Sequence, residues 1–490
     1  MTPLHTSKST RSRNPGSWLW LVLLCTGLIR LLTLGAYPLF DATEARYAEI
    51  ARKMAETANW ITPQIDYGVP FWGKPPLSTW ATAVSLRVFG INEFAARFSS
   101  LLFCLGMVWL TYRLAVRRLN RDYALTAAAV LATTALFFVA SGSVMTDPAL
   151  AFGTTLAMVA FWLAVKGDGS PDRLWGYLFF VGLAIGLLAK GPVAVVLTLL
   201  PIALWVVWKK QWTCLWQRLP WLTGSLLAMA IALPWYLAAE RATPGFLKYF
   251  IVGEHWKRFT ESGWKGDLYG TGHSHPHGTI WLYWLLATFP WCFVFIGALL
   301  RRGRRAVELL RSDWLAYLVL WSAAPMLFFT LAGNILWTYV LPGVPAFALL
   351  LAELINTAGD AAHPQKNQWL SRFLPLVTPV VFALVLVFLP QRIILKKSQK
   401  DIVAGYRAAR QTPAGKLIYL GSRPCSADFY SHGTAQLAED TQMLEPFLND
   451  RQPNFLAIKT NDLARMPESI AAHFMKIGDY GEYQLLVTTK

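Results

Sequence analysis

Charged side chains are scarce in this 490-residue chain, and acidic ones are the scarcest. Only 15% of the residues are charged and 28 are Asp or Glu, whereas 55% are hydrophobic. A soluble domain carries about 25% charged residues. Apolar runs of roughly 20 residues, each long enough to cross a hydrocarbon core of about 30 Å, recur along the chain. The composition therefore excludes an ordinary soluble enzyme and predicts an all-α polytopic membrane protein.

Cysteine is scarce as well. The five cysteines have no CxxC or other metal-ligand spacing, and four of them lie in or beside apolar runs. This distribution argues against a disulfide framework and predicts that the cysteines are packing residues.

Basic residues outnumber acidic ones and give a formal net charge of +17. They fall in short clusters between the apolar runs, where they can set membrane topology and contact anionic lipid headgroups. We therefore expect membrane lipids as partners, and no nucleic acid.

Eleven apolar runs are candidate membrane spans. They cover about residues 17–38, 94–116, 123–144, 147–165, 174–189, 191–208, 219–239, 279–300, 313–332, 336–357 and 370–391. Basic clusters precede span one and join spans two to three, six to seven and eight to nine, beginning at Lys8, Arg113, Lys209 and Arg301. By the positive-inside rule these loops face the cytoplasm, so the other loops face the periplasm.

Two domains are predicted. Residues 1–391 form the transmembrane domain, with a first exterior loop at 39–93 and a large one at 240–278. Residues 392–490 are more polar and contain three strand-like segments, GKLIYLGS, NFLAIKT and YQLLVTTK, with helical segments at about 401–410 and 463–475. They predict a small periplasmic α/β domain that either binds the acceptor or caps the fold.

The segments that look chemical all fall on the exterior side. DATEARYAEIARKMAETANW in the first loop keeps helical spacing, which predicts an amphipathic helix at the membrane surface. FWGKPPLSTW then holds Lys74 at headgroup depth, and MTDPAL places Asp147 at the start of a span. A snorkelling lysine and a helix N-cap are the structural alternatives for these two residues.

Six motifs occur in a fixed order between about residues 20 and 355: DATEARYAEIARKM, GKPPLSTW, MTDPAL, LLAKGP, GEHWKRF and TYVLPGVPAFALL. Together they resemble the bacterial lipid-linked sugar transferases that include the aminoarabinose transferases of lipid A and, more distantly, the protein O-mannosyltransferases. The resemblance implies the GT-C fold and a multi-pass glycosyltransferase of the bacterial inner membrane, with its active site facing the periplasm. It also implies an undecaprenyl-phosphate-linked sugar as the donor and lipid A or another envelope glycolipid as the acceptor, with direct displacement and inversion.

The resemblance assigns residues as well. Asp41 would be the catalytic carboxylate and Asp147 a second acid of the same site, while the donor phosphate would bind Lys74, Arg258 and Tyr339. The residues that would shape the site are Glu44, Arg46, Tyr47, Lys190, Glu254 and His255. A lipid phosphate that leaves gains negative charge, which fixed cations stabilise, and an acceptor hydroxyl needs a base. If the acceptor is itself a phosphate, Asp41 would act by orientation or electrostatics.

No cofactor is expected to be required, because a single phosphate is released and the exterior loops contain no DxD motif. His273, His275 and His277 form an HxHxH pattern in a glycine-rich loop. A flexible polar cover is the ordinary explanation of this pattern, and a divalent metal is the alternative. The chain carries Gly73 before Lys74, where the relatives usually carry Glu.

Three other functions stay open: a protein O-glycosyltransferase of the same fold, a lipid or solute transporter, and a scaffold. A transporter should show ionisable residues near the bilayer midplane, whereas Arg30 is the main intramembrane charge here. A scaffold would not need Asp41, Lys74, Asp147 and Arg258 on one side. Convergence of these four side chains on one cavity would discriminate the functions, and we expect a monomer.

Overall fold

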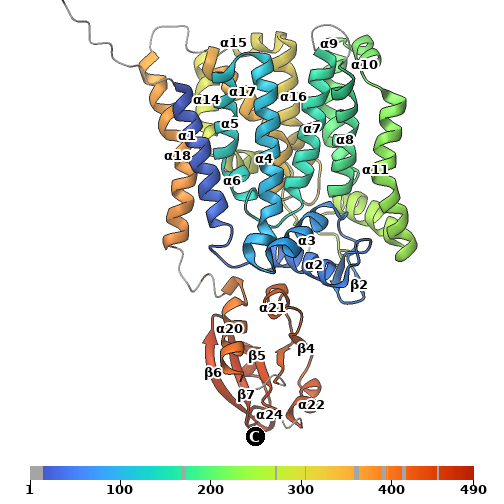
Figure 1. Cartoon of the computed structure of the whole chain (residues 1–490), viewed down its shortest axis with the longest axis vertical. Coiled ribbons are helices and arrows are strands. Elements are labelled where there is room, and N and C mark those ends of the chain that lie inside the picture. The colour runs from blue at the N-terminus through green and yellow to red at the C-terminus, as the bar shows by residue number, and fades with distance from the viewer. Residues whose placement is uncertain are drawn as a thin grey trace, which may run out of the picture.

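A bundle of apolar helices forms the body of the computed structural model, and a small α/β domain lies at one of its ends (Figure 1). The structure describes residues 15–166, 172–270, 273–303, 305–357, 364–388, 393, 396–410, 415–449 and 452–489. The basic residues Lys8, Arg11 and Arg13 and the predicted domain boundary at 391/392 lie outside these ranges.

Five helical segments among the described residues are long and apolar enough to cross a membrane. They are α4 (Glu93–Arg118), α7 (Asp147–Lys166), α8 (Arg173–Lys190), α11 (Trp221–Ala242) and the run Trp337–Asn356, which joins η3 (Trp337–Gly343) to α17 (Val344–Thr357). Two shorter apolar helices accompany them, α9 (Val193–Lys209) and α16 (Asp313–Phe329). Shorter apolar segments also lie within α1 (Pro15–Thr33) and α18 (Pro364–Phe388), at Ser17–Thr33 and Phe373–Phe388. The chain is thus a membrane protein, whereas the count of eleven spans stays a prediction.

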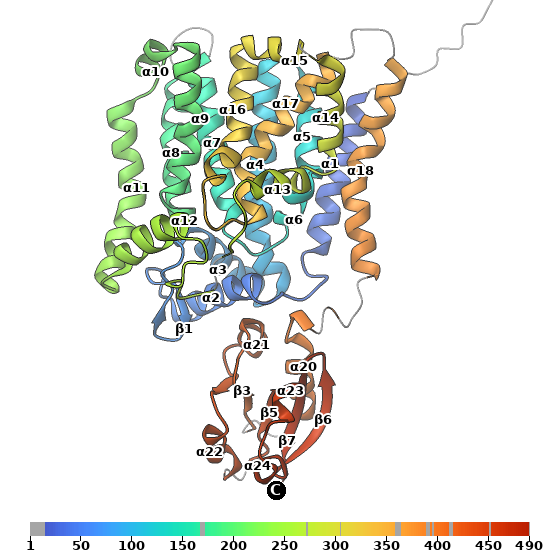
Figure 2. The same cartoon turned by 180° about the vertical axis from the view of Figure 1, so that it is seen from behind.

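Two of the predicted spans are broken. The segment predicted as 279–300 consists of α13 (Thr279–Ala287) and α14 (Trp291–Arg302), which are bent by 106° (Figure 2). Pro290 lies in this break and has no N–H to continue the helix. The segment predicted as 123–144 divides into α5 (Arg121–Thr133) and α6 (Ala135–Ala140). The two breaks meet, because the backbone N–H of Ala135 donates to the carbonyl of Phe289 at 2.8 Å.

Helices α7 and α8 approach each other closely enough to fix the site at their ends. A Cβ on Gly182 would lie 2.6 Å from the backbone nitrogen of Ala157, and one on Gly153 would lie 2.7 Å from that of Gly186. Small residues let membrane helices pack at such short range. The first residue of α7, Asp147, therefore stands beside the last residue of α8, Lys190.

The first exterior loop forms a helix, a hairpin and a second helix. They are α2 (Thr43–Thr57), β1 (Gln64–Asp66) paired with β2 (Val69–Pro70), and α3 (Leu77–Phe89). Ala45, Ala48 and Ala51 are buried, as the helical spacing predicts. The charged face is not open to water, however, since Arg52 and Lys53 are each only 1% exposed.

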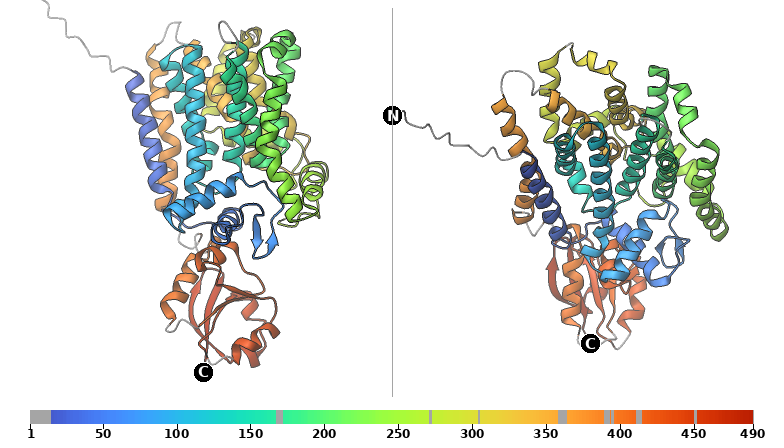
Figure 3. Two further views of the ribbon diagram at one scale, coloured as in Figure 1. Left: turned by 45° about the vertical axis from the view of Figure 1, so that its right-hand side comes forward. Right: turned by 45° about the horizontal axis from the view of Figure 1, so that its top comes forward.

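The C-terminal domain contains a five-stranded sheet in the order β4-β3-β5-β7-β6. Its strands and main helices are α20 (Lys400–Ala409), β3 (Leu417–Leu420), α21 (Cys425–Ser431), β4 (Gln436–Ala438), β5 (Phe455–Lys459), β6 (Phe474–Tyr480) and β7 (Tyr483–Thr488). The three expected strands are present as β3, β5 and β7. The helix expected at 463–475 is wrong for most of its length. Only the end of α23 (Thr460–Leu463) and the four-residue helix α24 (Glu468–Ala471) are helical there, and β6 begins at Phe474 and pairs antiparallel with β7. The domain lies next to α2 and α3 in all views (Figure 3).

Candidate active site

A cavity of about 400 Å³ lies where the ends of α8, α9 and α16 meet the large exterior loop. Its walls are mainly apolar, and cations stand among them. The lining residues are Lys74, Leu150, Lys190, Pro192, Val193, Val196, Leu197, Ile251, Glu254, His255, Trp256, Arg258, Phe259, Phe328, Phe329, Asn334 and Tyr339. Five segments far apart in the sequence therefore contribute to one concave site, as a ligand site requires.

Glu254 joins two of the cations. Its carboxylate accepts a hydrogen bond from Lys74 Nζ at 2.7 Å, and both of its oxygens accept from Arg258 Nη1 at 3.1 Å. Arg258 also pairs with Asp267 at 3.2 Å. The side chain of Glu254 is only 2% exposed, whereas Lys74 and Arg258 are each 18% exposed. The two cations are therefore more exposed than the anion that holds them.

These contacts determine the protonation states of Glu254, Lys74 and Arg258. Burial by itself would raise the pKa of Glu254, but Lys74 and Arg258 outweigh it and hold that pKa below its usual value. Burial alone would lower the pKa of Lys74, and the Glu254 carboxylate, with a smaller effect of Tyr47, raises it. All three groups are therefore charged at neutral pH.

The segment that carries Glu254 is a π-helix, η1 (Lys248–Lys257), followed by the short helix α12 (Arg258–Thr260). π-Helices are rare and are frequent at functional sites. Asn334, which is buried, fixes the end of this segment, because its amide nitrogen donates to the carbonyls of Arg258 and Glu261 at 2.7 and 2.8 Å. The large loop is thus held against the helix bundle at the cavity.

A second ion pair reaches the cavity through Lys190, which lines it, whereas its partner Asp147 does not. Lys190 Nζ donates to Asp147 Oδ1 at 2.7 Å and lies 4.6 Å from the ring centroid of Tyr339. His255 Nε2 lies 3.1 Å from the carbonyl of Lys190 and its Nδ1 lies 2.8 Å from the carbonyl of Phe250, while burial lowers the pKa of this imidazole. A neutral ring has one N–H, so it donates to one of these two carbonyls at a time.

Asp41 is not among the residues that line the cavity. It precedes α2, and its carboxylate accepts hydrogen bonds from the backbone N–H and the hydroxyl of Ser426 in the C-terminal domain. The helix that follows does reach the cavity region, because Tyr47 acts electrostatically on Lys74 and Arg258. The structure therefore brings Lys74 and Arg258 into one cavity, links Asp147 to it through Lys190, and places Asp41 at the junction between the two domains.

The remaining expected site residues pack around these groups. Glu44 forms an ion pair with the buried Arg97 at 2.8 Å, which fixes the start of α2 against α4. Arg46 donates to the carbonyl of Tyr269 in the large loop. Tyr47 meets Phe71 edge to face, with ring centroids 6.0 Å apart. All three hold the first loop against its neighbours.

The three histidines of the large loop have separate partners. His275 Nε2 lies 3.1 Å from the Tyr283 hydroxyl, and His277 Nδ1 lies 3.1 Å from the carbonyl of Thr330. Burial, with Arg258 nearby, lowers the pKa of His273. Within the described ranges, no three His, Cys, Asp or Glu side chains form a metal-binding group.

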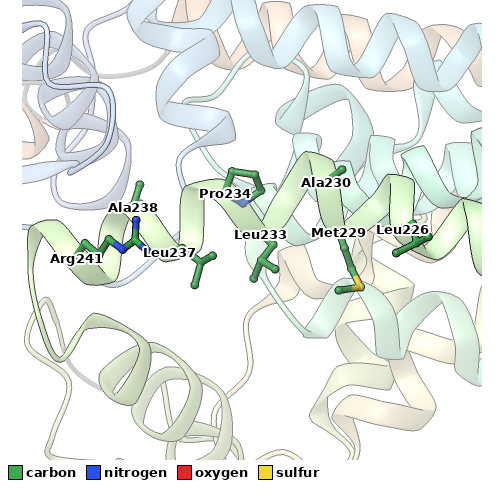
Figure 4. Close-up of a pocket in the computed structure, with 8 residues that line it drawn as sticks. All are labelled: Leu226, Met229, Ala230, Leu233, Pro234, Leu237, Ala238 and Arg241. Carbon is green, nitrogen blue, oxygen red and sulfur yellow. The ribbon is translucent and has the colours of Figure 1, made fainter.

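A second hollow lies along α11, with residues of this helix alone around it (Figure 4). Seven of the eight lining residues are apolar and the eighth is Arg241. One face of a single helix that is largely exposed carries no group of reactive side chains, so the cavity at Lys74 remains the candidate site.

Sequence reasoning missed three residues. Asp267 lies in the glycine-rich part of the large loop. It is an acidic residue among basic ones, and this signal could have identified it as a partner of Arg258. Asn334 stands in a turn that the sequence marks only by its glycine. Ser426 has no sequence signal, because only the docking of the C-terminal domain brings it to Asp41.

Comparison with known proteins finds relatives that are all described as glycosyltransferases. A family model described as dolichyl-phosphate-mannose-protein mannosyltransferase matches residues 18–250. An undecaprenyl phosphate-alpha-4-amino-4-deoxy-L-arabinose arabinosyl transferase of Aeromonas hydrophila is 30% identical over 398 residues, covering 79% of this chain and 69% of the relative. Transferase 1 of the same description from Pseudomonas fluorescens (strain Pf0-1) is 30% identical, covering 68% of this chain and 57% of the relative. The chain spans about three fifths of the length of the first curated relatives that it matches.

Solved structures share the fold. The crystal structure of ArnT from Cupriavidus metallidurans bound to undecaprenyl phosphate aligns with a TM-score of 0.78 at 17% identity. The alignment covers 96% of this chain and 98% of that chain. The structure of the same protein in the apo state aligns with a TM-score of 0.73 at 18% identity. The helical membrane fold expected from the sequence motifs is thereby confirmed.

Proposed function

We propose that this chain, which belongs to the ArnT-like family of membrane glycosyltransferases of the GT-C fold, transfers a sugar from a polyprenyl-phosphate carrier to an acceptor in the cell envelope. One observation carries the proposal: three cations, Lys74, Lys190 and Arg258, line a cavity whose other walls are mostly apolar. This combination suits a ligand with an anionic group at the end of a hydrocarbon chain.

The donor phosphate would bind at Lys74 and Arg258. Both cations are already charged and held by Glu254, so they need little rearrangement when the phosphate arrives. The isoprenoid chain would follow the apolar wall formed by Val193, Val196 and Phe328. The Tyr339 hydroxyl is a third candidate donor of a hydrogen bond to the phosphate.

The reaction proposed is a direct displacement with inversion. An acceptor oxygen forms a bond to the anomeric carbon while the bond from that carbon to the phosphate oxygen breaks. The lipid phosphate leaves with the electron pair, and Lys74 and Arg258 stabilise its added charge. A hydroxyl acceptor gives its proton to a carboxylate, for which Asp41 is the candidate because burial raises its pKa above the usual value.

Asp41 and the phosphate site would contact different ends of the reacting pair. Asp41 lies just before α2, and Tyr47 lies in the second turn of that helix. A sugar bound between them would point its anomeric carbon toward the acceptor. Asp147, paired with Lys190, would keep that lysine in place.

The site would face the periplasm of a bacterial inner membrane. The linkers that carry basic residues, between α9 and α10 (Trp212–Arg218) and at α15 (Arg305–Glu308), lie at the end of the bundle opposite α2 and the C-terminal domain (Figure 1). Together with the positive-inside rule this supports a periplasmic C-terminus. A reporter fused at Lys490 that is active only in the cytoplasm would refute this orientation.

The decisive experiment uses the purified full chain in lipid nanodiscs. It is incubated with a panel of undecaprenyl-phosphate sugars that includes 4-amino-4-deoxy-L-arabinose, with one nucleotide-sugar as control. Candidate acceptors, lipid A and a hydroxyl-bearing peptide, are then analysed by mass spectrometry. We expect transfer only from the lipid-linked sugars and to the glycolipid, without added metal. Transfer from the nucleotide-sugar alone would overturn the proposal.

A further inference from the structure

We propose that Ser426 is a positioning residue for Asp41, so that the C-terminal domain completes the catalytic site and is more than a cap on the fold. The inference rests on the proposed function, because it assumes that Asp41 is the catalytic carboxylate. It goes beyond that function by giving the soluble domain a part in the chemistry.

Ser426 holds both oxygens of the Asp41 carboxylate. Its backbone N–H donates to Oδ1 at 3.0 Å, and its hydroxyl donates to Oδ2. The backbone of Asp41 is fixed as well, since its N–H donates to the carbonyl of Lys397 at 2.8 Å. A carboxylate held at both oxygens has one orientation, and each oxygen keeps a lone pair for a proton from the acceptor.

The hydrogen bonds of the Ser426 hydroxyl direct its proton to Asp41. It is fully buried, and its oxygen accepts a hydrogen bond from the backbone N–H of Gln399 at 3.0 Å. The side chain of Gln399 in turn lies 3.3 Å from the hydroxyl of Tyr419 on β3. A hydroxyl carries one proton, so this arrangement directs it to Asp41.

The same domain anchors the rest of the loop. The Tyr430 hydroxyl accepts from the backbone N–H of Leu39 at 2.7 Å and donates to Glu93 at 2.9 Å. Lys400 pairs with Glu93 at 2.7 Å. Leu39 and Asp41 are therefore both held by residues of α21. This arrangement is expected if the reaction depends on the position of the loop that carries Asp41.

The electrostatic surroundings of Asp41 give the inference a measurable consequence. Burial raises the pKa of Asp41, and the two hydrogen bonds of Ser426, a backbone hydrogen bond of Cys425 and the charge of Lys397 lower it again. The other titratable groups that act on Asp41 are the thiol of Cys425 and the hydroxyls of Tyr419 and Tyr483. Loss of the Ser426 hydroxyl should raise the pKa of Asp41 further, so activity should be lost at a higher pH as the medium is acidified.

The experiment compares three variants in nanodiscs with the undecaprenyl-phosphate sugar that the wild type uses. Ser426→Ala removes the hydroxyl, and Ser426→Thr restores a hydroxyl. Ser431→Ala is the matched control, because it removes another buried hydroxyl from α21, one that contacts only Asp428 and Ala435. For each variant kcat and KM are measured across the pH range, with binding of undecaprenyl phosphate and thermal unfolding alongside.

We expect Ser426→Ala to lower kcat about tenfold at neutral pH, in line with one lost hydrogen bond to a charged group. The donor KM and the binding of undecaprenyl phosphate should stay within about twofold, since the phosphate site is separate. The acid limb of the kcat profile should move to higher pH. Ser426→Thr should recover most of the activity, and Ser431→Ala should keep the wild-type kcat and pH profile.

An unchanged kcat and acid limb in Ser426→Ala, with Asp41→Asn inactive, would overturn the inference and leave the role of Asp41 intact. Equal losses of kcat and stability in Ser426→Ala and Ser431→Ala would also overturn it, as a purely structural effect. Full activity of Asp41→Asn would instead refute the catalytic assignment on which the inference rests. If Ser426→Thr fails to fold, the pH profile of Ser426→Ala decides alone.

Discussion

The cavity at Lys74 and the junction at Asp41 use carboxylates in opposite ways. In the cavity, Glu254 lies between two cations, and they hold its pKa below the usual value despite its burial. At the junction, Asp41 is bound mainly by hydrogen bonds from Ser426, and burial raises its pKa. The buried Glu254 and the half-buried Asp41 thus differ in proton affinity because of their partners.

This contrast separates two tasks. A carboxylate that stays ionised can keep cations in position for a phosphate, whereas one with raised proton affinity can accept a proton. In the proposed function, the cations paired with Glu254 of η1 bind the phosphate, and Asp41, which precedes α2, accepts the proton. The predictions below test this separation.

The largest expected effect is that of Asp41→Asn. Removing the negative charge should lower kcat by about 10²–10⁴-fold, the usual contribution of a general base. Binding of undecaprenyl phosphate should stay within about twofold. Asp66→Asn is the control, because it neutralises another acid of the junction, one that pairs with Arg423. Transfer at the wild-type rate in Asp41→Asn would remove the distinction between the two regions.

The second prediction concerns Lys74 and Arg258 in the cavity, whose loss should impair binding of the lipid phosphate. Lys74→Ala and Arg258→Ala should each weaken the binding of undecaprenyl phosphate about tenfold or more, since a hydrogen bond to a charged group contributes about 1.5–3 kcal/mol. Calorimetry or native mass spectrometry measures this directly. Lys257→Ala is the matched control, as its exposed side chain neighbours Arg258 but lies outside the cavity. Wild-type binding in both cavity variants would contradict the phosphate assignment.

A smaller effect is expected from Glu254→Gln. The amide cannot neutralise Lys74 and Arg258, so undecaprenyl phosphate should bind about threefold more tightly and leave more slowly as product. The folded state should lose on the order of 1–3 kcal/mol, because two partly buried cations lose their anion. The pKa of Glu254 is lowered from 4.5, so this stability difference should be constant above about pH 5 and vanish as the pH falls through the lowered pKa. Weaker lipid binding in the variant would show that Glu254 contacts the ligand itself.

Local patterns of the sequence predicted much of the cavity. Lys74 follows interfacial aromatic residues, and Lys190 and Asp147 stand at the ends of predicted spans. Hydropathy and the positive-inside rule therefore predicted the membrane side and the depth of these residues. The pairing of Glu254 with Arg258 follows from a spacing of four residues on a helix. The association of Arg258 with Asn334, 76 residues apart, required the folded chain.

The junction could not be predicted in the same way. The charged face of α2 reads as a surface exposed to water, yet Arg52 and Lys53 are buried against the hairpin and Asp428. The contact of Asp41 with Ser426 joins positions 385 residues apart. The hydrophobic periodicity of a sequence does not predict how two domains dock, because docking depends on the shapes of the two surfaces and on charges that compensate across the interface.

The smallest expected effect on activity is that of Asp428 of α21, which should change stability alone. Its carboxylate lies 3.0 Å from Arg423 and 3.9 Å from Lys53. Burial nevertheless raises its pKa from 3.8 to about 6, with Arg423 and Lys53 lowering it and Glu49 and Asp66 raising it. A raised pKa means that the folded state holds this proton more tightly than the unfolded state. Stability should therefore fall as the pH rises from about 4 to about 6, and stay at the lower level above that range.

This loss should amount to about 3 kcal/mol, since the pKa rises from 3.8 to about 6 and one pKa unit corresponds to about 1.4 kcal/mol. Thermal unfolding and hydrogen exchange of residues 425–431, corrected for the intrinsic effect of pH on exchange, would measure it. Asp428→Asn cannot titrate and should flatten the profile while leaving donor binding unchanged. Asp440→Asn, an exposed acid of the same domain, is the control and should keep the wild-type slope. A slope that survives in Asp428→Asn would mean that another group titrates at the junction, and Asp41, the half-buried acid held by Ser426 of α21, would be the first to test.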